Sequence, residues 1–269
     1  MNNKMNNPGL QFDTFGRLTP TGFTHKANTS SRRYFQVNGA KPNTSAIYQK
    51  TAECFGQPDD LSLQQFQTQV EALHARLAQD EILKDLDGCA PIPFILPKGS
   101  ITDDLKASMA VYVASLSASF TNEFPKNRFT DHTLPEWKDQ FAVNPKSRGD
   151  AVLERSKSES VVGLFLPSLS EYSVPAAYEA ISKLPDSLAL SGFFEIAAAL
   201  IGTPGYLINA EAYSPLLWAT ANIAEHQAAG FHFAAYGSDM TLNYRAHLNE
   251  VSEYWWSGLT LISSFAKSN

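Results

Sequence analysis

The sequence predicts an α+β protein in which helices pack on a mixed, partly antiparallel sheet, with an irregular N-terminal arm. Apolar residues recur at helical spacing early and in the middle of the chain, whereas apolar runs typical of strands gather late. We find no strict strand–helix–strand repeat. Of the 269 residues, 43% are hydrophobic and 12% are aromatic, which is enough to build a sizeable core.

Charge divides the chain into two parts. Residues 1–50 contain seven Lys or Arg and one acidic residue, Asp13, and therefore carry +6. Because the whole chain carries −6, residues 51–269 carry −12. Aromatic residues are scattered through the basic segment, which is more than a purely disordered tail would contain. We therefore predict an irregular basic arm over 1–50 that lies against a single acidic α+β domain over 51–269.

Two helices and one strand are expected before residue 121. Apolar side chains at three- and four-residue steps predict a helix over 61–86, capped by one of the two preceding aspartates. The apolar run 92–96 lies between prolines, and Pro93 within it favours a strand at the edge of a sheet. A second helix is expected over 100–120, beginning at a Ser or Thr cap.

A long polar connection over 121–150 follows, with one helical turn expected over 134–141, and it is a candidate internal domain boundary. Val161–Leu166 is apolar throughout and predicts a buried strand, and helices are expected to begin at Ser173 and Ser191. The later elements are expected as a strand pair over 216–223 and 231–236, a helix or strand over 242–251, and one long strand or a strand pair over 254–265.

No motif in the sequence fixes a reaction. Glycine-rich nucleotide loops and a nucleophile elbow are both missing. Cys54 and Cys89 lack the clustered histidines of a zinc site and are expected as free thiols, so we predict neither a metal nor a cofactor. The turn Pro97–Ser100 can hold an anion at a helix start, or it is an ordinary strand-to-helix connection.

Polar groups that can support chemistry crowd near the C-terminus: His226, His232, Tyr236, Asp239, Tyr244, Arg245 and His247. On a strand over 231–236, His232 and Tyr236 share the face opposite the two phenylalanines. The candidate catalytic residues, for acid/base chemistry, are His232, Asp239 and Arg245. The candidate ligand-binding residues are Tyr236, His247, Trp255 and Trp256. The alternative is an ordinary half-exposed strand that ends in a Gly-Ser-Asp turn.

Two function classes follow. The first is a binding or interaction protein with a ligand or partner surface near the C-terminal sheet, because catalytic motifs are missing and the tandem Trp255-Trp256 is typical of binding surfaces. The second is a small-molecule enzyme with hydrolase-like chemistry at His232, Asp239 and Arg245. The acidic domain does not favour nucleic acid as a partner.

The sequence also bears on location. No apolar run is long enough for a membrane-spanning helix, and the polar start does not resemble a signal peptide. We therefore expect a soluble, cytoplasmic protein. The Ser-, Thr- and Asn-rich start raises one alternative, which is delivery by a secretion system that needs no signal peptide.

Overall fold

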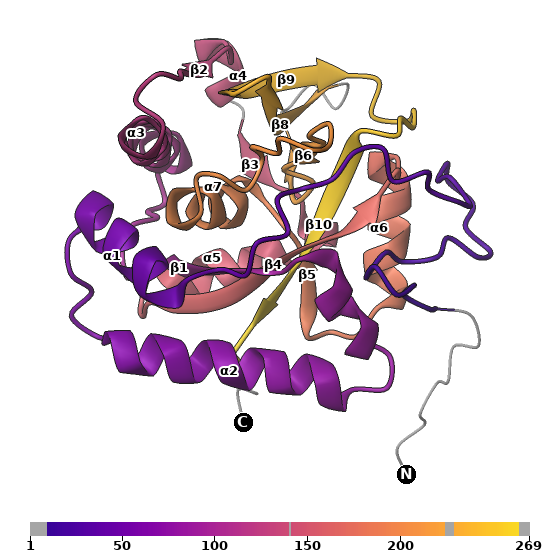
Figure 1. Cartoon of the computed structure of the whole chain (residues 1–269), viewed down its shortest axis with the longest axis horizontal. Coiled ribbons are helices and arrows are strands. Elements are labelled where there is room, and N and C mark those ends of the chain that lie inside the picture. The colour runs from indigo at the N-terminus through magenta and orange to yellow at the C-terminus, as the bar shows by residue number, and fades with distance from the viewer. Residues whose placement is uncertain (1–9, 140, 224–228, 264–269) are drawn as a thin grey trace.

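A computed structural model describes residues 10–139, 141–223 and 229–263 and confirms the predicted α+β class (Figure 1). The helices are α1 (Thr44–Phe55), α2 (Leu63–Gln79), α3 (Leu105–Glu123), α4 (Pro135–Lys138), α5 (Gly149–Ser156), α6 (Val174–Lys183) and α7 (Phe193–Gly202), with 3-10 helices η1 (Lys84–Cys89) and η2 (Pro145–Ser147). The strands are β1 (Ile92–Leu96), β2 (Phe129–Asp131), β3 (Ala142–Val143), β4 (Val161–Ser170), β5 (Leu188–Leu190), β6 (Leu216–Trp218), β7 (Asn222–Ile223), β8 (Ala229–Tyr236), β9 (Asp239–Ala246) and β10 (Trp255–Ile262).

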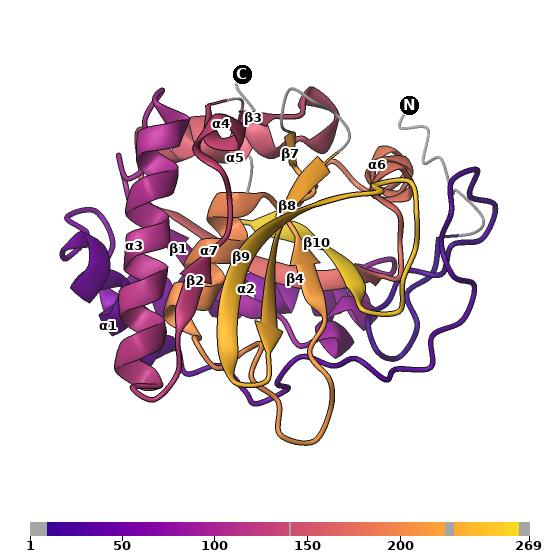
Figure 2. The ribbon, with the colours of Figure 1, turned by 90° about the horizontal axis from the view of Figure 1, so that it is seen from above.

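The main sheet is mixed, as predicted. Its strands follow the order β1-β4-β10-β6-β8-β9-β2, and β5 also pairs with β10. Most pairs are antiparallel, whereas β10–β6 and β9–β2 are parallel. Figure 2 shows β9 curving between β8 and β2 at one end of the sheet. At the other end β1 pairs with β4 alone among the strands of the described residues, so the strand that contains Pro93 lies at an edge, where a residue without an N–H is tolerated.

The sheet separates two hydrophobic clusters. Side chains of β4 alternate between them, as the pleat requires: Val161 and Phe165 face the cluster with α3 and α7, whereas Val162 and Leu164 face the cluster with α2 and α6. Figure 1 shows α3 and α7 on one side of the sheet and α2 on the other. The core therefore has two layers, one on each face of the sheet. The layer beneath α2 and α6 also contains Phe12 and Leu18, which precede the first helix.

Several helix boundaries differ from the prediction. Helix α1 was not predicted, and it crosses the expected limit of the arm at residue 50. Helix α2 is capped by Ser62, not by an aspartate, because Ser62 and Gln65 form a reciprocal capping box. Helix α3 begins after Asp104, whose side chain accepts the Ala107 N–H.

Later elements resolve the alternatives. The segment expected as helix or strand over 242–251 is strand β9 up to Ala246. In the described part of the segment expected over 254–265 there is one strand, β10. Strands β6 and β8 pair antiparallel, as predicted. None of the helices in the described residues combines the length and apolar composition that a membrane span requires.

Helix α7 is buried along its whole length, and Glu195 is its one charged residue. The Glu195 carboxyl accepts the Gly192 N–H at 3.1 Å, and the Asn222 side chain accepts the Phe193 N–H, so two side chains serve the start of this helix. Burial raises the pKa of Glu195 to about 7, although its carboxyl accepts hydrogen bonds from the backbone N–H groups of Glu195 and Gly192. This carboxyl is therefore close to its protonation midpoint at neutral pH.

Candidate functional site

Three of the predicted residues come together on the outer face of the C-terminal sheet. His232 on β8 lies opposite Trp218 on β6, with ring centroids 5.2 Å apart, and Trp218 meets Trp255 edge to face at 5.8 Å. The Arg245 guanidinium lies 5.5 Å from the centre of the Trp255 ring. As predicted, His232 faces away from Phe231 and Phe233, which lie in the first core cluster. We call Trp218, His232, Arg245, Tyr254 and Trp255 the aromatic cluster.

The aromatic cluster holds His232 in its neutral form. His232 is 2% exposed, and its Nδ1 has no hydrogen-bond partner among the described residues. Burial, and secondarily the charge of Arg245, lowers the pKa of His232 to about 3. The Trp255 Nε1 is likewise buried, with no hydrogen-bond partner in the part of the chain that the structure describes. A neutral, enclosed imidazole is poorly placed to exchange protons with a substrate.

The other predicted residues lie apart from this cluster. Asp239 pairs with Tyr236 at the tip of the β8–β9 hairpin, and its carboxylate accepts the Arg128 N–H at 2.9 Å. His247 is exposed beyond the end of β9. Trp256 points to the opposite face from Trp255 and packs on the first core cluster. His226 lies outside the described residues.

The arm (residues 10–43) reaches the aromatic cluster. Phe35 forms a parallel bridge with Tyr213, and its ring lies 5.5 Å from the Tyr254 ring. Ion pairs join Lys26 to Glu250 at 2.8 Å and Arg32 to Glu253 at 3.7 Å. The expected contact between the basic arm and the acidic domain is therefore present, and Figure 1 shows the indigo arm passing beside α6.

Arg17 anchors the arm to the sheet. It is 6% exposed, and its guanidinium donates to the Ser170 carbonyl at 3.0 Å and to the Asn28 carbonyl. Next to it, the Leu18 N–H donates to the Ser168 carbonyl, and the Leu18 carbonyl accepts the Tyr172 hydroxyl. One backbone hydrogen bond and two side-chain hydrogen bonds therefore join this part of the arm to β4 and the residues that follow it.

Replacing Arg17 with alanine is expected to lower the free energy of unfolding by about 2–3 kcal/mol, because two buried carbonyls lose a charged donor. Urea unfolding measures the loss, and chymotrypsin cleavage after Tyr34 or Phe35 should accelerate. Arg32→Ala is the matched control, since the Arg32 side chain is 77% exposed, and should stay within about 0.5 kcal/mol. Equal losses in the two variants would show that Arg17 does not anchor the arm.

Two hollows flank arm residues 33–36, and these residues contribute to the wall between them. The outer hollow, of about 1130 Å³, opens beside the C-terminal sheet. Its lining includes Tyr34, Phe35, Tyr213, Tyr236, Arg245 and Tyr254. Tyr34, Tyr213 and Tyr236 are 60%, 70% and 58% exposed, so their rings line the hollow while remaining accessible to solvent.

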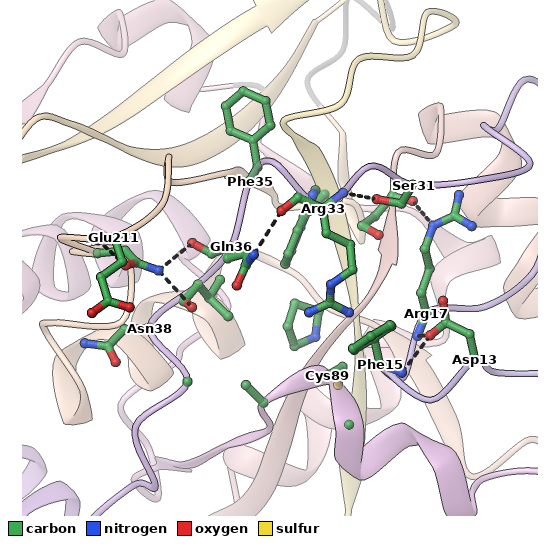
Figure 3. A pocket seen from close by; sticks show the side chains of 18 of the residues that line it. Asp13, Phe15, Arg17, Ser31, Arg33, Phe35, Gln36, Asn38, Cys89 and Glu211 are labelled. Carbon is green, nitrogen blue, oxygen red and sulfur yellow. Dashed lines mark hydrogen bonds between the residues drawn. The ribbon is translucent and has the colours of Figure 1, made fainter.

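The inner hollow, of about 820 Å³, lies between the arm and the end of η1 (Figure 3). Its lining includes Asp13, Phe15, Arg33, Cys89, Pro167 and Trp256. Gly16 and Gly88 let the arm lie against η1: a Cβ at Gly16 would be 2.5 Å from the Cys89 nitrogen, and one at Gly88 would be 2.5 Å from the Thr14 oxygen. Burial raises the pKa of the Cys89 thiol well above its usual range, so this wall carries no thiolate.

Three further predictions concern the two cysteines, an anion site in the turn Pro97–Ser100, and metal binding. Cys54 and Cys89 are both free, as predicted. In the turn Pro97–Ser100 the Lys98 N–H donates to the Ser160 hydroxyl and the Gly99 N–H to the Ser156 carbonyl, so these amides are not available to an anion. No group of metal-ligating side chains occurs among the residues that the structure describes.

Comparison with known proteins adds no functional information. No family model, no curated protein and no solved structure matches this chain. The functional conclusions therefore depend on the two hollows and on the residues that line them. Sequence reasoning missed Arg33, Tyr34 and Tyr213. The signal for the first two was the run Arg32-Arg33-Tyr34-Phe35, which joins residue types that are enriched at binding hot spots.

Proposed function

We propose that the protein is a non-catalytic binding protein whose outer hollow takes a protein segment that carries carboxylates. The observation that supports this most is the gathering of the exposed tyrosines Tyr34, Tyr213 and Tyr236 around one hollow. Tyrosine and arginine dominate the binding energy of protein interfaces, because they combine a large apolar surface with a hydrogen-bonding end. At about 1130 Å³ the hollow also exceeds the usual size of a small-molecule site.

The charge around the outer hollow favours an acidic partner. Arg32, Arg33 and Arg245 line it together with one carboxylate, that of Glu211. Because Arg32 also pairs with Glu253, the local excess is one positive charge, on a chain that carries −6 overall. Arg245 donates to the Tyr254 hydroxyl and lies over aromatic rings, and it makes no carboxylate contact within the described residues. Acidic side chains of a partner can pair with these guanidinium groups.

The hydrolase-like alternative has less support. His232 is enclosed and neutral, and Asp239 is engaged by the Arg128 N–H and pairs with Tyr236 at the hairpin tip. An acid/base site needs both groups within hydrogen-bond reach of one substrate. Arg245 does not favour the enzyme over the binding protein, because it also lines the outer hollow, where it can bind a partner.

Binding of labelled peptide pools tests the proposal. Three fluorescein-labelled random pools, enriched in Asp/Glu, in neutral polar residues or in Lys/Arg, are titrated with the protein and followed by anisotropy. We expect the acidic pool to bind best, and Tyr213→Ala to weaken its binding about ten-fold or more, because a hot-spot truncation removes more than about 1.4 kcal/mol.

The control variant is Val111→Ala on α3, another exposed apolar residue, which is 50% exposed and does not line the outer hollow; it should bind the acidic pool as the unmodified protein does. Three results contradict the proposal: equal binding of all pools, no effect of Tyr213→Ala, or tighter binding of a labelled dT12 oligonucleotide than of the acidic pool. The last result would indicate stacking of bases on the tyrosines.

A further inference from the structure

The guanidinium of Arg33 has no carboxylate contact within salt-bridge distance among the described residues. It lies over the Phe15 ring, with 3.3 Å between the guanidinium carbon and the ring centre, and Figure 3 shows it pointing into the inner hollow. Partial burial lowers the pKa of Arg33 from its ordinary value, and the charge of Asp13 only partly offsets this. A partly desolvated cation without a bonded counter-charge attracts an anion.

Of the other charged groups that line the inner hollow, Asp13, Arg17 and Asp87 are already engaged. The Asp13 carboxylate accepts the N–H groups of Phe15 and Arg17, each at 2.9 Å. Arg17 is bonded to two backbone carbonyls, and Asp87 accepts from His74 at 2.8 Å. Arg33 is therefore the cation in this hollow that remains available to a ligand.

The backbone around the hollow is held in an uncommon conformation. Arg33 and Ala90 have φ values of 54° and 57°, in the left-handed region that residues with a Cβ seldom adopt. The Arg33 N–H donates to the Ser31 hydroxyl and its carbonyl accepts from Gln36, so the turn that aims the side chain is fixed by its neighbours. Strained residues of this kind cluster at ligand sites.

We propose that the inner hollow binds a small ligand that has one carboxylate, held by Arg33, on a flat apolar ring. Phe15, Pro167 and Trp256 supply apolar wall for the ring, and the volume of about 820 Å³ lies within the usual range for small-molecule sites. A guanidinium binds a carboxylate through two parallel hydrogen bonds. A doubly charged phosphate is disfavoured, because Asp13, Asp87 and Glu211 also line the hollow and would repel it.

Ligand-detected NMR with four probes tests this site. Benzoate is compared with benzyl alcohol, benzylammonium and inorganic phosphate, which change the charge or remove the ring. We expect benzoate to bind most tightly, with benzyl alcohol about ten-fold weaker because it lacks the charge-assisted bonds. Equal or tighter binding of benzylammonium, preference for phosphate, or no benzoate binding at about 20 mM would each overturn the proposal.

Variants of Arg33 make the test specific. Arg33→Asn removes the guanidinium but suits the positive φ, since asparagine tolerates the left-handed region. It should weaken benzoate about ten-fold. Arg33→Lys, which keeps the charge without the planar fork, should weaken it less. Benzoate binding that is unchanged in Arg33→Asn, with a thermal midpoint within about 2 °C of the unmodified protein, would exclude Arg33 as the anchor.

The inner site and the proposed partner surface share Arg33 but differ in other lining residues, and two variants separate them. Tyr213 lines only the outer hollow, so Tyr213→Ala should leave benzoate binding within about two-fold. Phe15→Ala, at a residue that lines only the inner hollow, should weaken benzoate and leave the acidic peptide pool unaffected. The opposite pattern would place the benzoate in the outer hollow and overturn the proposal for the inner one.

Discussion

Replacing His232 with methionine is expected to make the fold markedly more resistant to acid. In the folded protein the pKa of His232 is lowered to about 3, whereas the unfolded chain takes up this proton near 6.5. Below pH 6.5 protonation therefore stabilises only the unfolded chain, and the free energy of unfolding falls by up to about 1.4 kcal/mol per pH unit. By pH 3.5 this single histidine removes about 4 kcal/mol.

Methionine does not titrate and packs well against aromatic rings, so His232→Met should match the unmodified protein within about 1.5 kcal/mol at pH 7.5. At pH 4.5 the difference in unfolding free energy between the two proteins should shift in favour of the variant by about 2–3 kcal/mol. Urea unfolding at the two pH values measures both quantities. His25→Gln, at an exposed histidine of the arm, is the control and should not show this shift. Parallel pH profiles for all three proteins would show that His232 titrates normally in the fold.

Replacing Glu195 with glutamine is expected to stabilise the protein at alkaline pH. The pKa of this buried carboxyl is raised from 4.5 to about 7, so its contribution to stability is complete below 4.5 and is lost as the pH rises through 7. By pH 8 the ionised Glu195 removes about 3 kcal/mol relative to pH 4.5. Glutamine keeps an oxygen that can accept the Gly192 N–H but carries no charge.

The measurement is the difference in unfolding free energy between Glu195→Gln and the unmodified protein at pH 5 and pH 8. It should move in favour of the variant by about 2–3 kcal/mol across this interval. Glu136→Gln at the exposed start of α4 is the control and should not change the pH profile in this way. A difference that stays constant with pH would show that Glu195 is already ionised at pH 5, against the effect of its burial.

The main features of the fold follow from local sequence pattern. The uninterrupted apolar run that begins at Val161 predicts the central buried strand, because a strand covered on both faces needs apolar side chains throughout. Pro93 predicts an edge strand, because proline has no N–H to donate to a second neighbouring strand. Helix caps are harder to predict, since Asp60 and Ser62 are both competent and only the reciprocal partner Gln65 decides between them.

The hollows could not be predicted in the same way. The contacts of Phe35 with Tyr213 and of Arg17 with Ser170 each join residues more than 150 positions apart. Such contacts cannot be predicted from a local sequence pattern. The crowding of polar residues after 225 indicated where part of a site lies, because strand pairing keeps His232 and Arg245 on one face. That His232 would be sealed beneath aromatic rings depends on Trp218 and Trp255, which arrive from two other strands.

The anchoring of the arm has a practical consequence for genetics. Phe12 and Leu18 belong to the second hydrophobic cluster, so a chain shortened by its first 50 residues would lose part of its interior as well as its basic surface. Altered targeting of such a truncated chain would report misfolding and could not reveal an address encoded in the arm. The delivery hypothesis is better tested by exchanging solvent-facing arm residues such as Arg32 and Tyr34, which leave the interior intact.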